Sequence, residues 1–172
     1  VVNEAANALY MSGGQTPVPI VFHMLQGGTG PQHYHTPQAM LWNCPGLEIV
    51  LPSCPRDVRG LLKTAVMTNN PTIFIDHASL LETEGPVPEI DVGIPFGQAE
   101  IKRSGTDVTV VATSFMVHRS LAVADALSSA GIDVEVVDPR TLVPFDFATI
   151  MQSIEKTRRV IVVDECHRSC GV

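Results

Sequence analysis

The chain has 172 residues, 45% of them hydrophobic, and a formal net charge of −7 with no basic run longer than Arg158-Arg159. Phosphate backbones are bound by clustered Lys and Arg, so this composition argues against a nucleic-acid partner. No apolar stretch approaches the roughly 20 residues of a membrane span, and no signal-peptide pattern opens the chain. The length allows one large domain or two small ones, each with a real core.

The first part of the chain alternates apolar runs with helical patterns. The segment NEAANALYM, residues 3–11, is typical of a helix that ends at the glycines after Ser12. Apolar runs at 18–24, 47–52 and 72–76 predict three strands that are buried on both faces. Strand, helix and strand follow one another at the spacing of a βαβ crossover, so we expect a parallel sheet.

Two helices are expected between these strands. A short helix takes Thr36 as its N-cap and Pro37 as its first residue. A longer helix opens at residues 53–57 and continues to about Met67. Its predicted apolar face comprises Val58, Leu61, Leu62, Ala65 and Val66.

The segment from Glu82 to Phe96 has three prolines, scattered acids and no hydrophobic period. It reads as a connection between domains, with a long surface loop as the alternative. We therefore predict an α/β protein of two units with mostly parallel sheets. The first unit spans residues 1–83, the linker 84–96 and the second unit 97–172.

The second unit repeats the α/β pattern. Segments 99–103 and 107–113 flank Ser104-Gly105-Thr106, which predicts a hairpin or a turn. A parallel strand is expected at 134–138, a helix over 147–157 begun by Asp146, and a last strand at 159–165. An amphipathic helix is predicted over 114–130, with Leu121, Val123, Ala124 and Leu127 facing inward.

The glycine-rich loop from Gly27 to Gly30 delivers two histidines, His33 and His35, to the start of a helix. Glycine lets backbone amides approach a ligand closely, and imidazole moves protons near neutral pH. Many catalytic histidines are presented in this way, although the local pattern by itself does not decide between this reading and the alternative. A turn that carries solvent-exposed histidines is the alternative reading.

Several charged groups stand at predicted strand ends, where ligands bind in open parallel sheets. Arg140 lies between Asp138 and Asp146, and a buried salt bridge that fixes the turn is favoured over a ligand site. The pair Asp164-Glu165 carries the same two readings. For Asp76-His77 the readings are a tuned acid or base and a histidine satisfied within its loop, of which the second is favoured. The segment Cys166-His167-x-x-Cys170 resembles part of a metal cluster but lacks a second ligand pair, so ordinary thiols are favoured over zinc.

Long ordered blocks resemble the beta subunit of the thiamine-diphosphate-dependent decarboxylating component of 2-oxo-acid dehydrogenase complexes. The pyruvate, branched-chain 2-oxo-acid and acetoin enzymes share this pattern. The resemblance covers essentially the whole chain, and it implies the later part of a thiamine pyrimidine-binding domain followed by a transketolase C-terminal-like domain. The blocks are PQH, PGLEIVLPSCPRDVRGLLKTA, NNPTIFIDH, IPFGQAEIKRSGTDVTVVATSFMVHRSLAVADAL, VVDPRTLVPFD and VIVVDE.

The resemblance also implies roles for particular residues. His33, which follows Gln32 after the glycine loop, matches the histidine that faces the thiazolium of the cofactor. His35 departs from the family pattern. A structural monovalent cation, potassium for example, is implied mostly at backbone carbonyls. The matching positions are Ile20, Ala65, Val66, Thr68 and Asn70.

The resemblance further implies that the diphosphate and its magnesium are bound by an alpha subunit, and that the glutamate which activates the cofactor lies upstream of Val1. Both ends of the chain read as cut, so we expect a piece of a longer protein. The implied partners are the alpha subunit, a second beta subunit and the lipoyl acyltransferase core, in the bacterial cytoplasm or the mitochondrial matrix.

Two alternatives stay open from the sequence. One is an enzyme of the transketolase or deoxyxylulose-phosphate-synthase type, which shares both domain types. The other is a non-catalytic assembly module.

Overall fold

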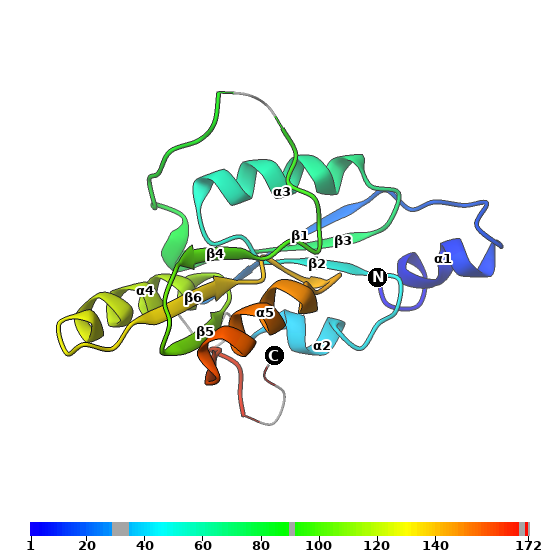
Figure 1. The fold of residues 1–172 in the computed structure, drawn as a ribbon. Coiled ribbons are helices and arrows are strands. Elements are labelled where there is room, and N and C mark those ends of the chain that lie inside the picture. Colours follow the sequence, from blue (N-terminus) through cyan, green and yellow to red (C-terminus); the bar gives the residue numbers. More distant parts are fainter. Residues whose placement is uncertain (29–34, 90–91, 169–170, 172) are drawn as a thin grey trace.

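The computed structural model describes residues 1–28, 35–89, 92–168 and 171, and these form two four-stranded sheets (Figure 1). In the first sheet the strand order is β1-β3-β2-β7. Both β1 and β2 run parallel to β3, which confirms the predicted crossover. The strands are β1 (Val21–Gln26), β2 (Glu48–Val50), β3 (Thr72–His77) and β7 (Thr141–Val143).

In the second sheet the order is β4-β6-β5-β8, and β5 runs parallel to both β6 and β8. The strands are β4 (Glu100–Arg103), β5 (Val108–Ala112), β6 (Val134–Asp138) and β8 (Val160–Val163). Of the two alternatives predicted at residues 104–106, the hairpin is wrong, because β4 pairs with β6 and not with β5. The turn between them crosses the start of β6, where the amides of Thr106 and Asp107 both donate to the Asp133 carbonyl. A Cβ on Gly105 would lie 2.3 Å from the Val134 carbonyl carbon, so glycine permits this crossing.

Helices cover both faces of the sheets. Figure 1 shows α3 on one side of the first sheet and α2 on the other side. Among the described residues, none of these helices has the length and apolarity needed to cross a bilayer. The helices are α1 (Ala5–Met11), α2 (Pro37–Leu41), α3 (Pro55–Met67), α4 (Phe115–Ser128) and α5 (Phe147–Thr157), with a 3₁₀ turn η1 (Ala78–Leu80).

The core follows the two-residue period of the strands. Val50 and Phe74 pack under α3, while Ile49, Ile73 and Ile75 pack on the opposite face with residues of α1, α2 and β7. In the second sheet α4 and α5 occupy opposite faces in the same way. Strands β2 and β3 are therefore buried on both faces, as predicted.

Two expectations about burial are wrong. Strand β1 forms an edge of the first sheet, so His23 and Leu25 are exposed. In the helices, Leu62, Val66 and Val123 are exposed, because each is rotated by about 100° from the stripe that meets the sheet.

Helix α2 begins after Thr36 as predicted, but the Thr36 side chain makes no capping hydrogen bond.

The two units share a sheet. Strand β7 comes from the second unit, yet it pairs antiparallel with β2 of the first. The segment expected to be a linker also packs along α3, where Ile94 N donates to the Gly60 carbonyl and Thr64 Oγ1 donates to the Ile94 carbonyl. The division of the chain at residues 84–96 stays a prediction.

Candidate functional site

The carboxyl edges of the two sheets face each other. Ser53, which follows β2, donates its hydroxyl to Asp138 at the end of β6, with an O–O distance of 2.6 Å. His77, which ends β3, stacks on Phe115, the first residue of α4, with ring centroids 4.9 Å apart. Because ligands of parallel sheets bind at this edge, we expect a ligand-binding site at the junction.

His77 is the buried histidine of this junction, with 3% of its surface exposed. Its Nδ1 accepts a hydrogen bond from the Ser79 amide at 3.1 Å, so the proton of a neutral ring belongs on Nε2. Nε2 lies 3.0 Å from Glu165 Oε2, at ion-pair distance but outside hydrogen-bond geometry. The structure therefore joins two of the predicted strand-end groups, Asp76-His77 and Asp164-Glu165, through His77 and Glu165.

The neighbouring carboxylate, Asp76, has a different partner. His23 Nε2 lies 2.7 Å from Asp76 Oδ2, and the His23 side chain is 61% exposed. Asp76 therefore forms a surface pair with His23 of the edge strand β1, while the carboxylate that faces His77 comes from the second unit.

Further polar atoms are left without partners around His77. Gln26 is the register partner of His77 on β1, Ser114 precedes Phe115, and Gln38 donates its amide to Cys166, the residue after Glu165. Within the described part of the chain, Gln26 Oε1, Gln38 Oε1 and Ser114 Oγ are buried and make no hydrogen bond. Buried polar atoms are normally paired, so these offer hydrogen-bonding capacity to a ligand or a partner.

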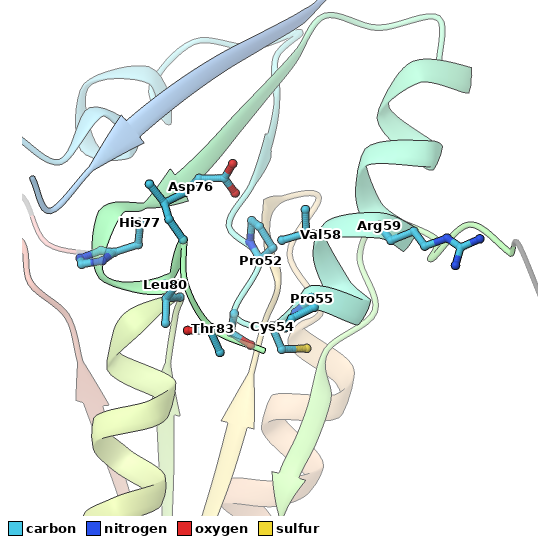
Figure 2. Close-up of a pocket in the computed structure, with 11 residues that line it drawn as sticks. Pro52, Cys54, Pro55, Val58, Arg59, Asp76, His77, Leu80 and Thr83 are labelled. Atoms are coloured by element: carbon cyan, nitrogen blue, oxygen red, sulfur yellow. The ribbon is translucent and has the colours of Figure 1, made fainter. Parts of the chain in front are cut away.

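A cavity of about 300 Å³ opens beside this junction, between the end of β3 and the start of α3 (Figure 2). Pro52 and Val58 give it an apolar wall, and Cys54 and Thr83 lie below them. The side chains of Asp76 and His77 leave β3 in different directions, and Arg59 extends away from the cavity.

A buried ionic cluster ties the same edges together. Arg140 donates from Nε and Nη2 to the Gln98 carbonyl, and its Nη1 lies 3.4 Å from Asp57 and 3.7 Å from Glu100. The expected partners of the Arg140 side chain, Asp138 and Asp146, are therefore wrong. A buried salt bridge is present, but it joins the two units instead of fixing one turn.

Lys102 is the second cation of the cluster, within 2.6 Å of both Asp57 and Glu100 and 3.6 Å from Asp138. Burial alone would lower the pKa of Lys102, but the three carboxylates raise it above its usual range. Burial also disfavours charge on Asp57, yet the hydrogen bond and charge of Lys102 hold the pKa of Asp57 below normal. Burial dominates at Asp138 and raises its pKa to about 6.

Asp146 acts as predicted, as the N-cap of α5. Its carboxylate accepts hydrogen bonds from the amides of Thr149 and Ala99. Burial opposes the charge, but hydrogen bonds from the Thr149 hydroxyl and these amides keep the pKa of Asp146 below its usual value.

The predicted catalytic histidine, His33, lies outside the described residues. The structure describes the loop on both sides of it: Gly27 with a φ of 69° and His35, which is exposed. The role of His33 stays a prediction. The possible metal ligand Cys170 also lies outside the described residues, and no group of three His, Cys, Asp or Glu suited to a metal occurs among those described.

The positions expected to hold a monovalent cation lie at the amino ends of β1 and β3 and at the end of α3. Ala65 and Val66 stand in the last turn of α3, where carbonyls have no intrahelical donor. The Ile20 carbonyl accepts from the Thr72 amide. A carboxylate that the sequence did not single out, Glu48, accepts hydrogen bonds from the side chains of Thr68, Asn70 and Thr72.

Family models match both halves of the chain. The transketolase pyrimidine-binding domain matches residues 2–83, and the transketolase C-terminal domain matches residues 97–172. The chain belongs to the transketolase family. The mostly parallel α/β architecture and the two domain types expected from the sequence are thereby confirmed.

The relatives of this transketolase-family chain include several beta subunits. It is 42% identical to the beta subunit of acetoin:2,6-dichlorophenolindophenol oxidoreductase from Cupriavidus necator, covering all of this chain and 52% of the relative. It is 42% identical to the mitochondrial pyruvate dehydrogenase E1 beta subunit of Ascaris suum, covering all of this chain and 50% of the relative. It is 39% identical to the pyruvate dehydrogenase E1 beta subunit of Bacillus subtilis, covering all of this chain and 54% of the relative. The chain thus spans about half the length of the curated relatives it matches.

Solved structures agree on the fold. A split-gene transketolase described as an inactive beta4 tetramer superimposes with a TM-score of 0.74 and 22% identity, over 90% of this chain and 51% of that one. A transketolase variant from Pichia stipitis superimposes with a TM-score of 0.61 and 16% sequence identity, over 93% of this chain and 26% of that one.

The resemblance to beta subunits predicted from the sequence is confirmed by the 39–42% identities to the curated relatives.

Proposed function

We propose that the chain supplies the pyrimidine-binding and C-terminal domains of the beta subunit of a 2-oxo-acid or acetoin dehydrogenase. Such an enzyme cleaves its substrate oxidatively on thiamine diphosphate and passes the acyl group to lipoamide. The observation that carries the proposal is the 39–42% identity, over the whole chain, to pyruvate and acetoin beta subunits.

The residues at the junction fit a polar cofactor. Gln26, Ser114 and His77 place unpaired, buried polar atoms at the facing carboxyl edges, where a group that exchanges protons needs partners. Thiamine diphosphate, when bound, supplies the carbanion chemistry. We assign proton transfer next to it to His33, and the binding of the diphosphate and magnesium to the alpha subunit.

The proposed assembly contains the alpha subunit, a second beta subunit and the lipoyl acyltransferase core. We place it in the bacterial cytoplasm or the mitochondrial matrix, according to source. A potassium ion bound by Ile20, Ala65, Val66, Thr68 and Asn70 would stabilise the end of α3, and Glu48 would add negative charge beside it.

Replacement of His33 tests the proposed catalytic role. In the beta subunit reconstituted with its alpha subunit, His33→Ala is expected to lower acyl transfer to lipoamide by about 10²–10⁴-fold, the usual contribution of a general acid or base. The matched control is His35→Ala, on an exposed neighbour, with a small effect expected. Turnover of His33→Ala within about twofold of wild type, or a reversed ranking of the two variants, would refute the assignment.

Cofactor binding by the chain on its own tests the division of labour. We expect the 172-residue chain to show no decarboxylase activity and weak or no binding of thiamine diphosphate, because the diphosphate site is assigned to the alpha subunit. Calorimetry with cofactor and magnesium measures this directly. Submillimolar binding would contradict the assignment.

A further inference from the structure

We propose that His77 is a positioning residue: held by Phe115 and Glu165 of the C-terminal domain, it fixes the backbone at Gly27, where β1 ends. Its effect on catalysis rests on the function proposed above, since the glycine loop after Gly27 leads to His33. The structural part of the proposal rests on described residues of both domains.

His77 packs directly against the residue that follows β1, Gly27. A Cβ added to Gly27 would lie 2.0 Å from Nε2 and 2.3 Å from Cε1 of His77, so the imidazole packs directly against the Gly27 backbone. Gly27 has a φ of 69°, in the left-handed region that favours glycine. Gln26 and His77 are register partners, so the turn at Gly27 and the ring of His77 are attached to the same point of the sheet.

Phe115 of α4 holds one face of the His77 ring. The rings of His77 and Phe115 are stacked with an interplanar angle of 17°. Phe115 follows Ser114, which has φ 50° and ψ −124°, a rare conformation for a residue with a side chain. Ser114 is 1% exposed, and its hydroxyl has no partner within the described structure. Strain of this kind persists where surrounding structure enforces it, and here it places Phe115 against His77.

Glu165 completes the contacts. It follows β8 and places Oε2 3.0 Å from Nε2, while the Ser79 amide holds Nδ1 from the other side of the ring. The orientation of the imidazole is therefore set by a backbone amide of its own domain and by a ring and a carboxylate of the other. A shift of the C-terminal domain would reach Gly27 through this ring.

Three substitutions of His77 separate its contacts. His77→Asn offers Oδ1 near the position of Nδ1, so it keeps the bond from Ser79 but loses the ring and the group that faces Glu165. His77→Gln places an amide near the position of Nε2 and keeps the group that faces Glu165. His77→Phe keeps the ring alone. The control is His23→Asn, which removes the exposed histidine that pairs with Asp76 on the same sheet.

Each variant is tested by two measurements. Amide hydrogen exchange at residues 26–28 of the full chain reports the backbone without any activity. In the reconstituted enzyme, kcat and KM report catalysis. We expect His77→Asn to lose protection at 26–28 and to lower kcat by about 10²-fold with little change in KM, as a misplacement of about 1 Å does. His77→Gln is expected to retain more amide protection and a higher kcat than His77→Asn. His23→Asn is expected to match wild type in both measurements.

The outcomes separate this proposal from the proposed function. Wild-type exchange at residues 26–28 in His77→Asn would overturn the positioning role. A fall in kcat that equals the fall in folded fraction, or an equal effect of His23→Asn, would overturn it as well. Loss of protection in His77→Asn, together with no dehydrogenase activity in the wild-type beta subunit reconstituted with its alpha subunit, would support the positioning role and refute the proposed function.

Discussion

Replacing Asp138 by Asn is expected to stabilise the protein at alkaline pH and to leave its stability nearly unchanged near pH 4. Asp138 is fully buried between Ser53, the Arg140 amide and Lys102. Asn keeps an oxygen for the Arg140 amide, and the Ser53 hydroxyl can turn to Asp57, 3.4 Å away. The substitution therefore removes a buried charge while retaining most of its contacts.

The magnitude follows from the pKa of Asp138, which burial raises from 3.8 to about 6. Between these values the folded protein binds a proton that the unfolded chain does not, so this group makes the wild type less stable as pH rises through the window. The rise corresponds to about 3 kcal/mol. Asn carries no such cost, so above pH 7 the variant is expected to exceed wild type by up to about 3 kcal/mol, roughly 6–12 °C in Tm.

Thermal unfolding of both proteins at pH 4 and pH 8, followed by circular dichroism, measures this difference. The control is Asp57→Asn, because the charge of Lys102 lowers the pKa of Asp57. Its charged form contributes stability above the unfolded pKa that is lost as pH falls, so this variant is destabilised at pH 8 and less so in acid. The reasoning about Asp138 fails if Asp138→Asn is destabilised at pH 8 by as much as at pH 4.

Three smaller changes test other parts of the fold. Asp146→Ala removes the cap that accepts from Thr149 and should cost about 1 kcal/mol in urea unfolding; no change would mean that the cap is not needed. Gly105→Ala should cost about 1–3 kcal/mol or more, because its Cβ meets the backbone of Val134; wild-type stability would contradict that contact. The exposed apolar strand β8 should make the chain associate in sedimentation at micromolar concentration, and Ile161→Lys should reduce this; a monomeric wild type would refute it.

The parallel sheets could be predicted because their signals are local. Apolar runs such as 72–76, separated by helices with clear starts, indicate βαβ units whatever the rest of the chain does. The helix cap at Asp146 could be predicted for the same reason, because its sequence signal lies within the first turn of α5. Strand β7 cannot be predicted in this way, because it has only three residues between Pro139 and Pro144, too few to show a period.

The junction could be predicted only as separate strand ends. His77 and Glu165 each stood out as a group at the end of a strand, but their pairing depends on how two domains meet, which spacing does not encode. Lys102 and Asp57 resemble ordinary surface charges of a short strand and a helix start. Each stands beside another charged residue, Arg56 or Arg103, so the local sequence gives no sign that a second domain buries them, and the ionic cluster could not be predicted from it.

The pairing of β7 with β2 has a consequence for how the chain can be divided. Residues 1–83 produced by themselves would present the backbone of Ile49 and Val50 as a bare sheet edge, a known route to aggregation. The boundary between the two family matches is therefore not a point at which this protein can be divided into two intact parts. Grafting either module onto a relative would have to carry residues 141–143 with it.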